Sequence, residues 1–311
     1  MSDSNTLTGG LWLSRSRIGL KIFLKHLLAP VGLIARQKKG LRVLFYHRVN
    51  THAFEQLGLV SREISVRTGT FEKQMAYLSQ RGYRSLTLSE CHQMLSGDIP
   101  VESKAVLITF DDGYRDNLTD AAPILAKYGF TALVFPVVSL IGADNRAMPM
   151  GDPEGLGDFM SADELRLWLD QGHEIGSHTM THPVLTHTDD EALDTELRQS
   201  REHLTDLAGK TCTSIAYPTG DVDDRVAGRV KAIGYDLGFT TQSGTSLPGA
   251  DMALVKRTEV SISDTQLIFR LKMNGYFDWL GFRDSGAYRA LMRGVNHMMR
   301  SLVSLSKNRT S

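Results

Sequence analysis

The sequence feature that most constrains the fold is a continuous, mainly apolar run from Ala105 to Phe110, with Thr109 as its one polar residue, which ends abruptly in Asp111-Asp112-Gly113. An apolar run of this length, without alternating polar residues, is typical of a strand buried on both faces of a parallel sheet. Because parallel strands need crossover connections, usually helices, the run predicts an α/β fold. The aspartates that follow lie where a parallel strand ends, the position at which such folds keep their active sites.

Strand and helix patterns alternate through most of the 311-residue chain. Further strands are predicted at 42–46, 83–88, 131–136, 173–177, 214–217 and 236–240. Helices are predicted at 70–81, 161–172, 188–207 and 222–233. This alternation favours parallel strands closed as a distorted (β/α) barrel. We predict one catalytic domain, residues 41–283, rather than two domains.

The composition is that of an ordinary globular protein. Hydrophobic residues make up 41% and charged residues 23%, and the formal net charge is zero, so the overall charge does not indicate nucleic-acid binding. The two cysteines, Cys91 and Cys212, match no metal or redox spacing and are expected to be inert thiols. No run of about 18 apolar residues is present, so no transmembrane helix is predicted.

Both ends of the chain carry a basic, amphipathic pattern. In the N-terminal arm, residues 1–40, Arg17, Lys21 and Lys25 lie opposite an apolar stripe on one predicted helix. The apolar stripe consists of Leu20, Phe23, Leu24, Leu27 and Val31. The C-terminal segment 284–311 repeats the pattern. Such helices either contact an anionic membrane surface or pack on the domain with their basic residues in water, and the sequence leaves both open. Because no clear secretory signal is present, we expect a cytoplasmic protein, peripheral on the inner face of the membrane.

Two polar segments after predicted strands carry residues suited to metal chemistry. Asp111 and Asp112 follow one strand, and His178 and His182 follow another. One carboxylate and two imidazoles form a common open-sided ligand set for a catalytic divalent metal, and a helical turn would place the two histidines on one side. Asp112 completes this set, and the other aspartate is then available as a general base. Each segment alone also fits a plainer role, a turn for Asp-Asp-Gly and a solvated or capping pair for the histidines.

The segments TFDDGYRDN, SHTMTHP and AYPTGD resemble the first three motifs of the polysaccharide deacetylase family, carbohydrate esterase family four, and the resemblance covers most of the chain. It implies a distorted (β/α) barrel that hydrolyses N-acetyl groups, or some O-acetyl groups, from sugars. Asp111 is then the general base for an attacking water activated by the metal, and a backbone N–H near Thr219 stabilises the oxyanion. The residues that hold the divalent metal, commonly zinc, are Asp112, His178 and His182.

The chain departs from the family pattern in two places. The third motif usually begins with an arginine that orients the base, but this chain has Ala216 there, and the usual C-terminal histidine motif has no match. Some members resemble a circular permutation in which the acid comes from an N-terminal Tyr-His, so His47 is the predicted general acid. Arg257, near a late strand end, is the predicted replacement for the orienting arginine. The residues expected around the substrate or its oxyanion are Tyr217, Pro218 and Thr219. For Tyr217, a position in the core is favoured.

Together these patterns predict a metal-dependent hydrolase that removes the N-acetyl group from an N-acetylhexosamine unit of a glycan or lipid-linked sugar. An O-deacetylase or deformylase on the same scaffold is an alternative that keeps the metal site and changes the substrate. A non-catalytic glycan-binding module is another alternative, but it would leave Asp111 without a role. The expected partners are the glycan or lipid-linked sugar and an anionic membrane surface in peripheral contact, and no nucleic acid is expected.

Overall fold

A computed structural model describes residues 4–35, 40–148 and 156–284 of the chain. Its strands are β1 (Arg42–Tyr46), β2 (Arg48–Asn50), β3 (Ser65–Arg67), β4 (Arg84–Ser85), β5 (Ala105–Asp112), β6 (Leu133–Pro136), β7 (Glu174–Ile175), β8 (Ser214–Ala216), β9 (Leu237–Phe239) and β10 (Thr258–Glu259). Its α-helices are α1 (Ser4–Leu28), α2 (Gly32–Ala35), α3 (Leu59–Ile64), α4 (Thr68–Gln80), α5 (Leu88–Ser96), α6 (Ala122–Lys127), α7 (Ala162–Asp170), α8 (Asp190–Ala208), α9 (Asp224–Ile233) and α10 (Gln266–Met273). The helix predicted at 284–311 lies outside the described residues, apart from its first residue.

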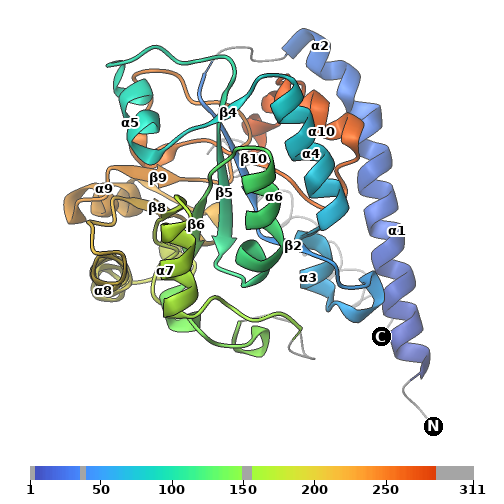
Figure 1. The fold of residues 1–311 in the computed structure, drawn as a ribbon, viewed down its shortest axis with the longest axis horizontal. Helices are drawn as coiled ribbons and strands as arrows, with labels where there is room; N and C mark the ends of the chain where they lie inside the picture. The colour runs from blue at the N-terminus through green and yellow to red at the C-terminus, as the bar shows by residue number, and fades with distance from the viewer. Residues whose placement is uncertain (1–3, 36–39, 149–155, 285–311) are drawn as a thin grey trace, which may run out of the picture.

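Parallel strands form the centre of the fold, with helices packed around them (Figure 1). β5 pairs with β1 along one edge, and with β4 and then β6 along the other. The order of the main sheet is β10-β1-β5-β6-β7, with β4 paired to β5 in addition. Every one of these pairings is parallel, which confirms the α/β class that the apolar run predicted.

β8 and β9 form a separate parallel pair that single bridges link to the main sheet. Ser177, just after β7, bridges to Ile215 in β8, and Phe239 in β9 bridges to Val255, shortly before β10. The rings of Phe135 in β6 and Phe239 lie 5.4 Å apart between centroids, so the two groups of strands share an apolar interior. The main sheet and the β8-β9 pair therefore have a barrel-like arrangement made of parallel pairings, while β2 and β3 form a separate parallel pair.

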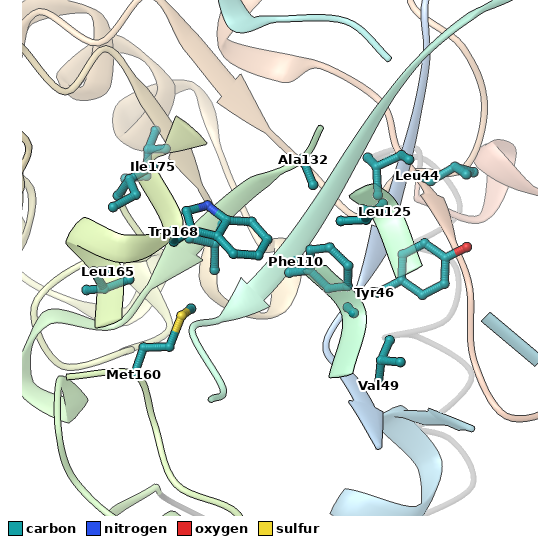
Figure 2. Close-up of a cluster of buried hydrophobic side chains, with 14 of the residues drawn as sticks. Leu44, Tyr46, Val49, Phe110, Leu125, Ala132, Met160, Leu165, Trp168 and Ile175 are labelled. Carbon is teal, nitrogen blue, oxygen red and sulfur yellow. The ribbon is translucent and has the colours of Figure 1, made fainter. Parts of the chain in front are cut away.

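Alternate side chains of β5 enter two separate hydrophobic cores. Ile108 and Phe110 belong to the core beneath the covering helices, where Phe110 meets Trp168 of α7 edge-on with centroids 6.1 Å apart (Figure 2). Leu107 belongs to the other core, together with Phe239. Both faces of β5 are therefore buried, as its continuous apolar sequence predicted.

Several element boundaries differ from those expected. α4 and α9 lie close to the predicted ranges, whereas β4 and β7 have two residues each and are shorter than predicted. The N-terminal arm forms α1, a short 3₁₀ turn and α2. Among the described helices, none combines the length and the apolar character needed to cross a bilayer. Cys91 and Cys212 are free and buried, and burial raises the pKa of Cys212 to about 11, in agreement with inert thiols.

Candidate active site

The carboxyl end of β5 presents two buried carboxylates through a tight turn. Asp112 and Gly113 both have left-handed backbone conformations, with φ of 71° and 84°. A Cβ atom at Gly113 would lie 2.8 Å from the Cβ of Pro136, so only glycine fits at that position. Aspartate visits the left-handed region more readily than most residues. The turn leaves Asp111 and Asp112 only 2% and 4% exposed at the edge of the sheet.

The two histidines lie on a loop after β7, and the helical turn predicted for them is absent. Thr179 and His182 have φ of 69° and 62°, which a continuous right-handed helix excludes. The Thr179 hydroxyl accepts a hydrogen bond from the N–H of His182 at 3.1 Å. A carboxylate oxygen of Glu196 accepts from the N–H groups of Met180 and Thr181 at 2.8 and 2.9 Å. The loop brings the two imidazole rings to 4.8 Å between centroids, so the predicted proximity arises from a different backbone path.

Asp112, His178 and His182 offer three donor atoms that face one another. Asp112 Oδ1 lies 3.5 Å from His178 Nε2 and 3.7 Å from His182 Nε2. All three donor atoms lie within 4.8 Å of one another, and no other such group of His, Cys, Asp or Glu occurs among the described residues. For bonds about 2.1 Å long at tetrahedral angles, donor atoms lie about 3.4 Å apart. The observed spacing therefore fits a divalent cation.

Hydrogen bonding fixes the direction in which His178 presents its ring. Its Nδ1 lies 2.8 Å from the carbonyl oxygen of Ala216, so Nδ1 carries the proton and Nε2 is free to act as a ligand. Burial lowers the pKa of His178 to about 4, which keeps the ring neutral near pH 7, as metal binding requires. Ala216, which occupies the position of the family's usual arginine, thus contributes through its backbone.

Asp111 is held by Arg257, the contact that was predicted for this pair. Arg257 Nη1 donates to Asp111 Oδ1 at 2.6 Å, and Nη2 donates to Oδ2 at 2.8 Å. Arg257 is itself fixed by a bond from Nε to the carbonyl oxygen of Thr240, at 2.9 Å, and by the ring of Phe45, 4.4 Å from its guanidinium carbon. Burial alone would raise the pKa of Asp111, but Arg257 and the nearby His178 lower it to about 2. Asp111 is therefore ionised near neutral pH.

Glu196 on α8 is a residue of the site that the sequence does not reveal. Besides its two bonds to backbone N–H groups, its second oxygen accepts from the hydroxyl of Thr181 at 2.6 Å. The carboxylate of Glu196 accepts three hydrogen bonds and so holds the loop between His178 and His182. Because two of its partners are backbone groups of a distant loop, only the fold brings Glu196 to them.

The other predicted residues fall into two groups. His47 and Thr219 line one cavity of about 660 Å³, whose lining does not include Asp111 or the three candidate metal ligands. Thr219 has a left-handed backbone with φ of 59°. Tyr217 and Pro218 are buried. The Tyr217 hydroxyl donates to the carbonyl oxygen of Ala253 at 2.8 Å. The side chain of Tyr217 therefore belongs to the core and does not line a substrate groove.

The family comparison agrees with this geometry. Residues 98–238 match the model of the family described as polysaccharide deacetylase. The matched segment contains Asp111 and all three candidate metal ligands, whereas His47 and Arg257 lie outside it.

Curated relatives cover more of the chain. YxkH of Bacillus subtilis (strain 168), whose name places it among the polysaccharide deacetylases, is 29% identical over 221 residues, 71% of each chain. The poly-beta-1,6-N-acetyl-D-glucosamine N-deacetylase of Staphylococcus aureus (strain MRSA252) is 26% identical over 272 residues, 82% of this chain and 88% of that protein. The Escherichia coli (strain K12) protein of the same name is 25% identical over 251 residues, 68% of this chain but only 36% of that longer protein.

A solved structure supports the fold. The Streptococcus pyogenes deacetylase PplD, in complex with acetate, superposes with a TM-score of 0.66 at 22% identity, over 76% of this chain and 99% of that one. At this identity the likeness concerns the fold alone. The family match, the curated relatives and the shared fold agree with one another. The segment 98–238 matches the polysaccharide deacetylase family, and together with the curated relatives this match indicates a carbohydrate deacetylase, a hydrolase.

Proposed function

We propose that this chain is a metal-dependent N-deacetylase that removes acetyl groups from N-acetylhexosamine units of a glycan. The observation that carries the proposal is the grouping of Asp112, His178 and His182 beside a separate aspartate, Asp111, whose position Arg257 fixes. The Staphylococcus and Escherichia relatives are named as N-deacetylases of poly-beta-1,6-N-acetyl-D-glucosamine. N-acetylglucosamine units are therefore the first substrate to examine.

The donor set suits Zn²⁺, which binds imidazole nitrogen and carboxylate oxygen and leaves a position open in catalytic sites. When bound, the cation would supply Lewis acidity, which polarises the acetyl carbonyl and makes water more acidic. His178 and His182 would present neutral imidazoles, and Asp112 the single negative charge. We propose zinc as the native metal on this chemistry.

Asp111 is proposed as the general base. Each of its carboxylate oxygens accepts one hydrogen bond from Arg257 and keeps a further lone pair, so the group can still accept a proton from water. With a pKa of about 2, Asp111 is ionised before the reaction and releases the accepted proton readily. Arg257 is proposed to orient the base, in the role of the arginine that Ala216 replaces.

The leaving amine needs a proton, and His47 is proposed to donate it. Its place at the end of β1, in the wall of the same cavity as Thr219, supports this role. The backbone N–H of Thr219 is proposed to donate to the developing oxyanion. The substrate is proposed to be a glycan held at a membrane, as the basic amphipathic ends of the sequence predict.

Acetate release from N-acetylglucosamine oligomers tests the proposal. We expect the wild-type protein to release acetate and Asp111→Asn to lose at least about 100-fold in kcat, while both bind the oligomer equally. An acetylated xylan provides the control for O-deacetylation. Release of acetate from the xylan alone, or oligomer binding without any release, would contradict N-deacetylation.

A further inference from the structure

α1 packs on the domain through its charged side. Lys21 Nζ donates to Glu63 Oε2 at 2.9 Å. Lys25 Nζ donates to Asp264 Oδ1 at 2.7 Å and to the hydroxyl of Ser263 at 2.7 Å. Asp264 also accepts from Lys272 Nζ at 2.7 Å. This orientation is the reverse of the usual one, in which an amphipathic helix turns its apolar face toward the domain.

The apolar stripe of α1 consequently faces outward. The exposed fractions of its side chains are 57% for Leu20, 62% for Phe23, 41% for Leu24 and 62% for Leu27, and Val31 in the 3₁₀ turn that follows α1 is 42% exposed. Their spacing of three and four residues places them on one face. In Figure 1, α1 runs along one edge of the domain, and no other labelled element covers its outer side. A contiguous apolar surface of this kind marks an interaction site.

The charge of the sequence segment that carries the apolar stripe indicates the partner. Lys21 and Lys25 are paired with Glu63 and Asp264, so the net positive charge of the segment comes from its other basic residues. Between residues 4 and 54 the sequence has no Asp or Glu. Basic residues from the same stretch up to residue 39 are Arg15, Arg17, Lys21, Lys25, Arg36, Lys38 and Lys39. The whole chain has a net charge of zero, so the positive charge of the N-terminal arm is a local excess. An apolar helix face within a cationic segment complements an anionic lipid surface.

The same charge argues against two other occupants. A second copy would bring two cationic helices together, which repel each other. The C-terminal segment 285–311 is also basic, with Arg289, Arg293, Arg300, Lys307 and Arg309 and no acidic residue. Neither a second copy of the chain nor its C-terminal segment offers negative charge to complement the basic N-terminal arm.

α1 also forms one wall of the cavity that His47 and Thr219 line. Ile18, Lys21 and Lys25 of α1 lie on its lining. The lining of this cavity is also rich in hydroxyl groups, which can donate to and accept from sugar hydroxyls. The hydroxyl-bearing residues of the lining are Thr219, Thr241, Ser243, Thr258, Ser261 and Ser263.

We propose that α1 docks the protein on an anionic lipid surface through the apolar stripe, with the hydroxyl-lined cavity directly behind it. Docking brings the cavity that His47 lines close to the membrane, where a lipid-linked or membrane-bound glycan is presented. The docking itself does not depend on catalysis, whereas the account of the presented glycan rests on the proposed deacetylase function.

Flotation of the full-length protein with vesicles tests the docking. The protein is mixed with vesicles of phosphatidylcholine and phosphatidylglycerol, or of phosphatidylcholine alone, and the vesicle-bound fraction is measured. We expect binding to the anionic vesicles, weakened by salt, and at least about tenfold weaker binding for the triple variant Leu20→Ser, Phe23→Ser, Leu27→Ser. Circular dichroism and acetate release from soluble oligomers should match the wild type for this variant.

The matched control replaces Leu167, Leu247 and Leu267 by serine, since these side chains are similarly exposed, at 48%, 54% and 54%, on other surfaces. The control should float like the wild type. Asp112→Asn should also float while losing acetate release, which separates docking from catalysis. Wild-type protein that stays with the unbound fraction, or a stripe variant that floats as well as the control, would overturn the proposal. A stripe variant that changes only the oligomeric state would overturn it as well.

Discussion

Arg257 binds both carboxylate oxygens of Asp111, at 2.6 and 2.8 Å, across a separation of 146 residues in the chain. Arg257 is completely buried and Asp111 nearly so. Geometry of this kind is the strongest form of ion pairing available to a carboxylate. It fixes the position of Asp111 and holds its pKa low against the opposing effect of burial.

Arg257→Lys should reduce kcat/KM by about 10- to 100-fold, because lysine cannot bind both oxygens at once. The pKa of Asp111 should also rise, so the acidic limb of the pH–rate profile should move to higher pH. Arg42→Lys is a matched control, since Arg42 makes the same two-point contact with Asp278 in a buried setting. If both variants keep the wild-type pH–rate profile, Arg257 does not determine the pKa of Asp111.

Glu196→Gln should weaken metal binding by about 10- to 100-fold, because the glutamate fixes the loop that carries both histidines. Titration of the metal-free protein with Zn²⁺ measures this affinity. Glu202→Gln, on an exposed position of the same helix, should bind metal like the wild type. Equal affinities for the two variants would show that the loop does not need Glu196.

His47→Asn should lower kcat on N-acetylglucosamine oligomers by about 100- to 10,000-fold, because an amine leaves poorly without a proton donor. Hydrolysis of 4-nitrophenyl acetate should fall much less, since nitrophenolate leaves without protonation. Metal content should stay at the wild-type level. A loss of metal, or an equal decrease in kcat on both substrates, would show that His47 is not the general acid.

His173 should make stability depend on pH. It lies against Trp168, with ring centroids 4.0 Å apart, and its Nδ1 accepts from the N–H of Ala132 at 3.2 Å. Burial lowers the pKa of His173 from 6.5 to about 4. In that interval the unfolded chain binds a proton that the folded chain does not, so this stabilisation is complete above pH 6.5 and is lost as the pH falls toward 4.

Urea unfolding between pH 7 and about 4 measures the effect. As the pH is lowered, the free energy of unfolding should decrease more steeply for the wild type than for His173→Asn, which has no titrating group at this position. The difference between the two proteins in the pH dependence of the free energy of unfolding gives the contribution of His173 alone, because the other titrating groups are common to both. Parallel curves would show that His173 is not buried as a neutral ring.

The main strand could be predicted because its signal is local. The apolar run from Ala105 to Phe110 specifies a strand buried on both faces, and the structure extends it to Asp112. The path of the histidine loop could not be predicted in the same way. A spacing of four suits a helix, but the loop takes its shape from contacts with Thr179 and Glu196.

The orientation of α1 was also beyond the sequence. Its pattern shows two faces but not which one meets the domain. That choice depends on Glu63 and Asp264, which lie far away in the chain. The role of Arg257 could be predicted only because Ala216 stands where the family usually has an arginine. The role of orienting the general base was therefore open, and Arg257 could be assigned to it.

Metal analysis of the purified protein and its variants tests the central claim most directly. We predict about one equivalent of divalent metal in the wild type and in Asp111→Asn, and far less in Asp112→Asn and His178→Ala. Chelation should abolish acetate release, and added Zn²⁺ should restore it. Full metal content in the two ligand variants, or full activity of the chelated wild type, would contradict the account.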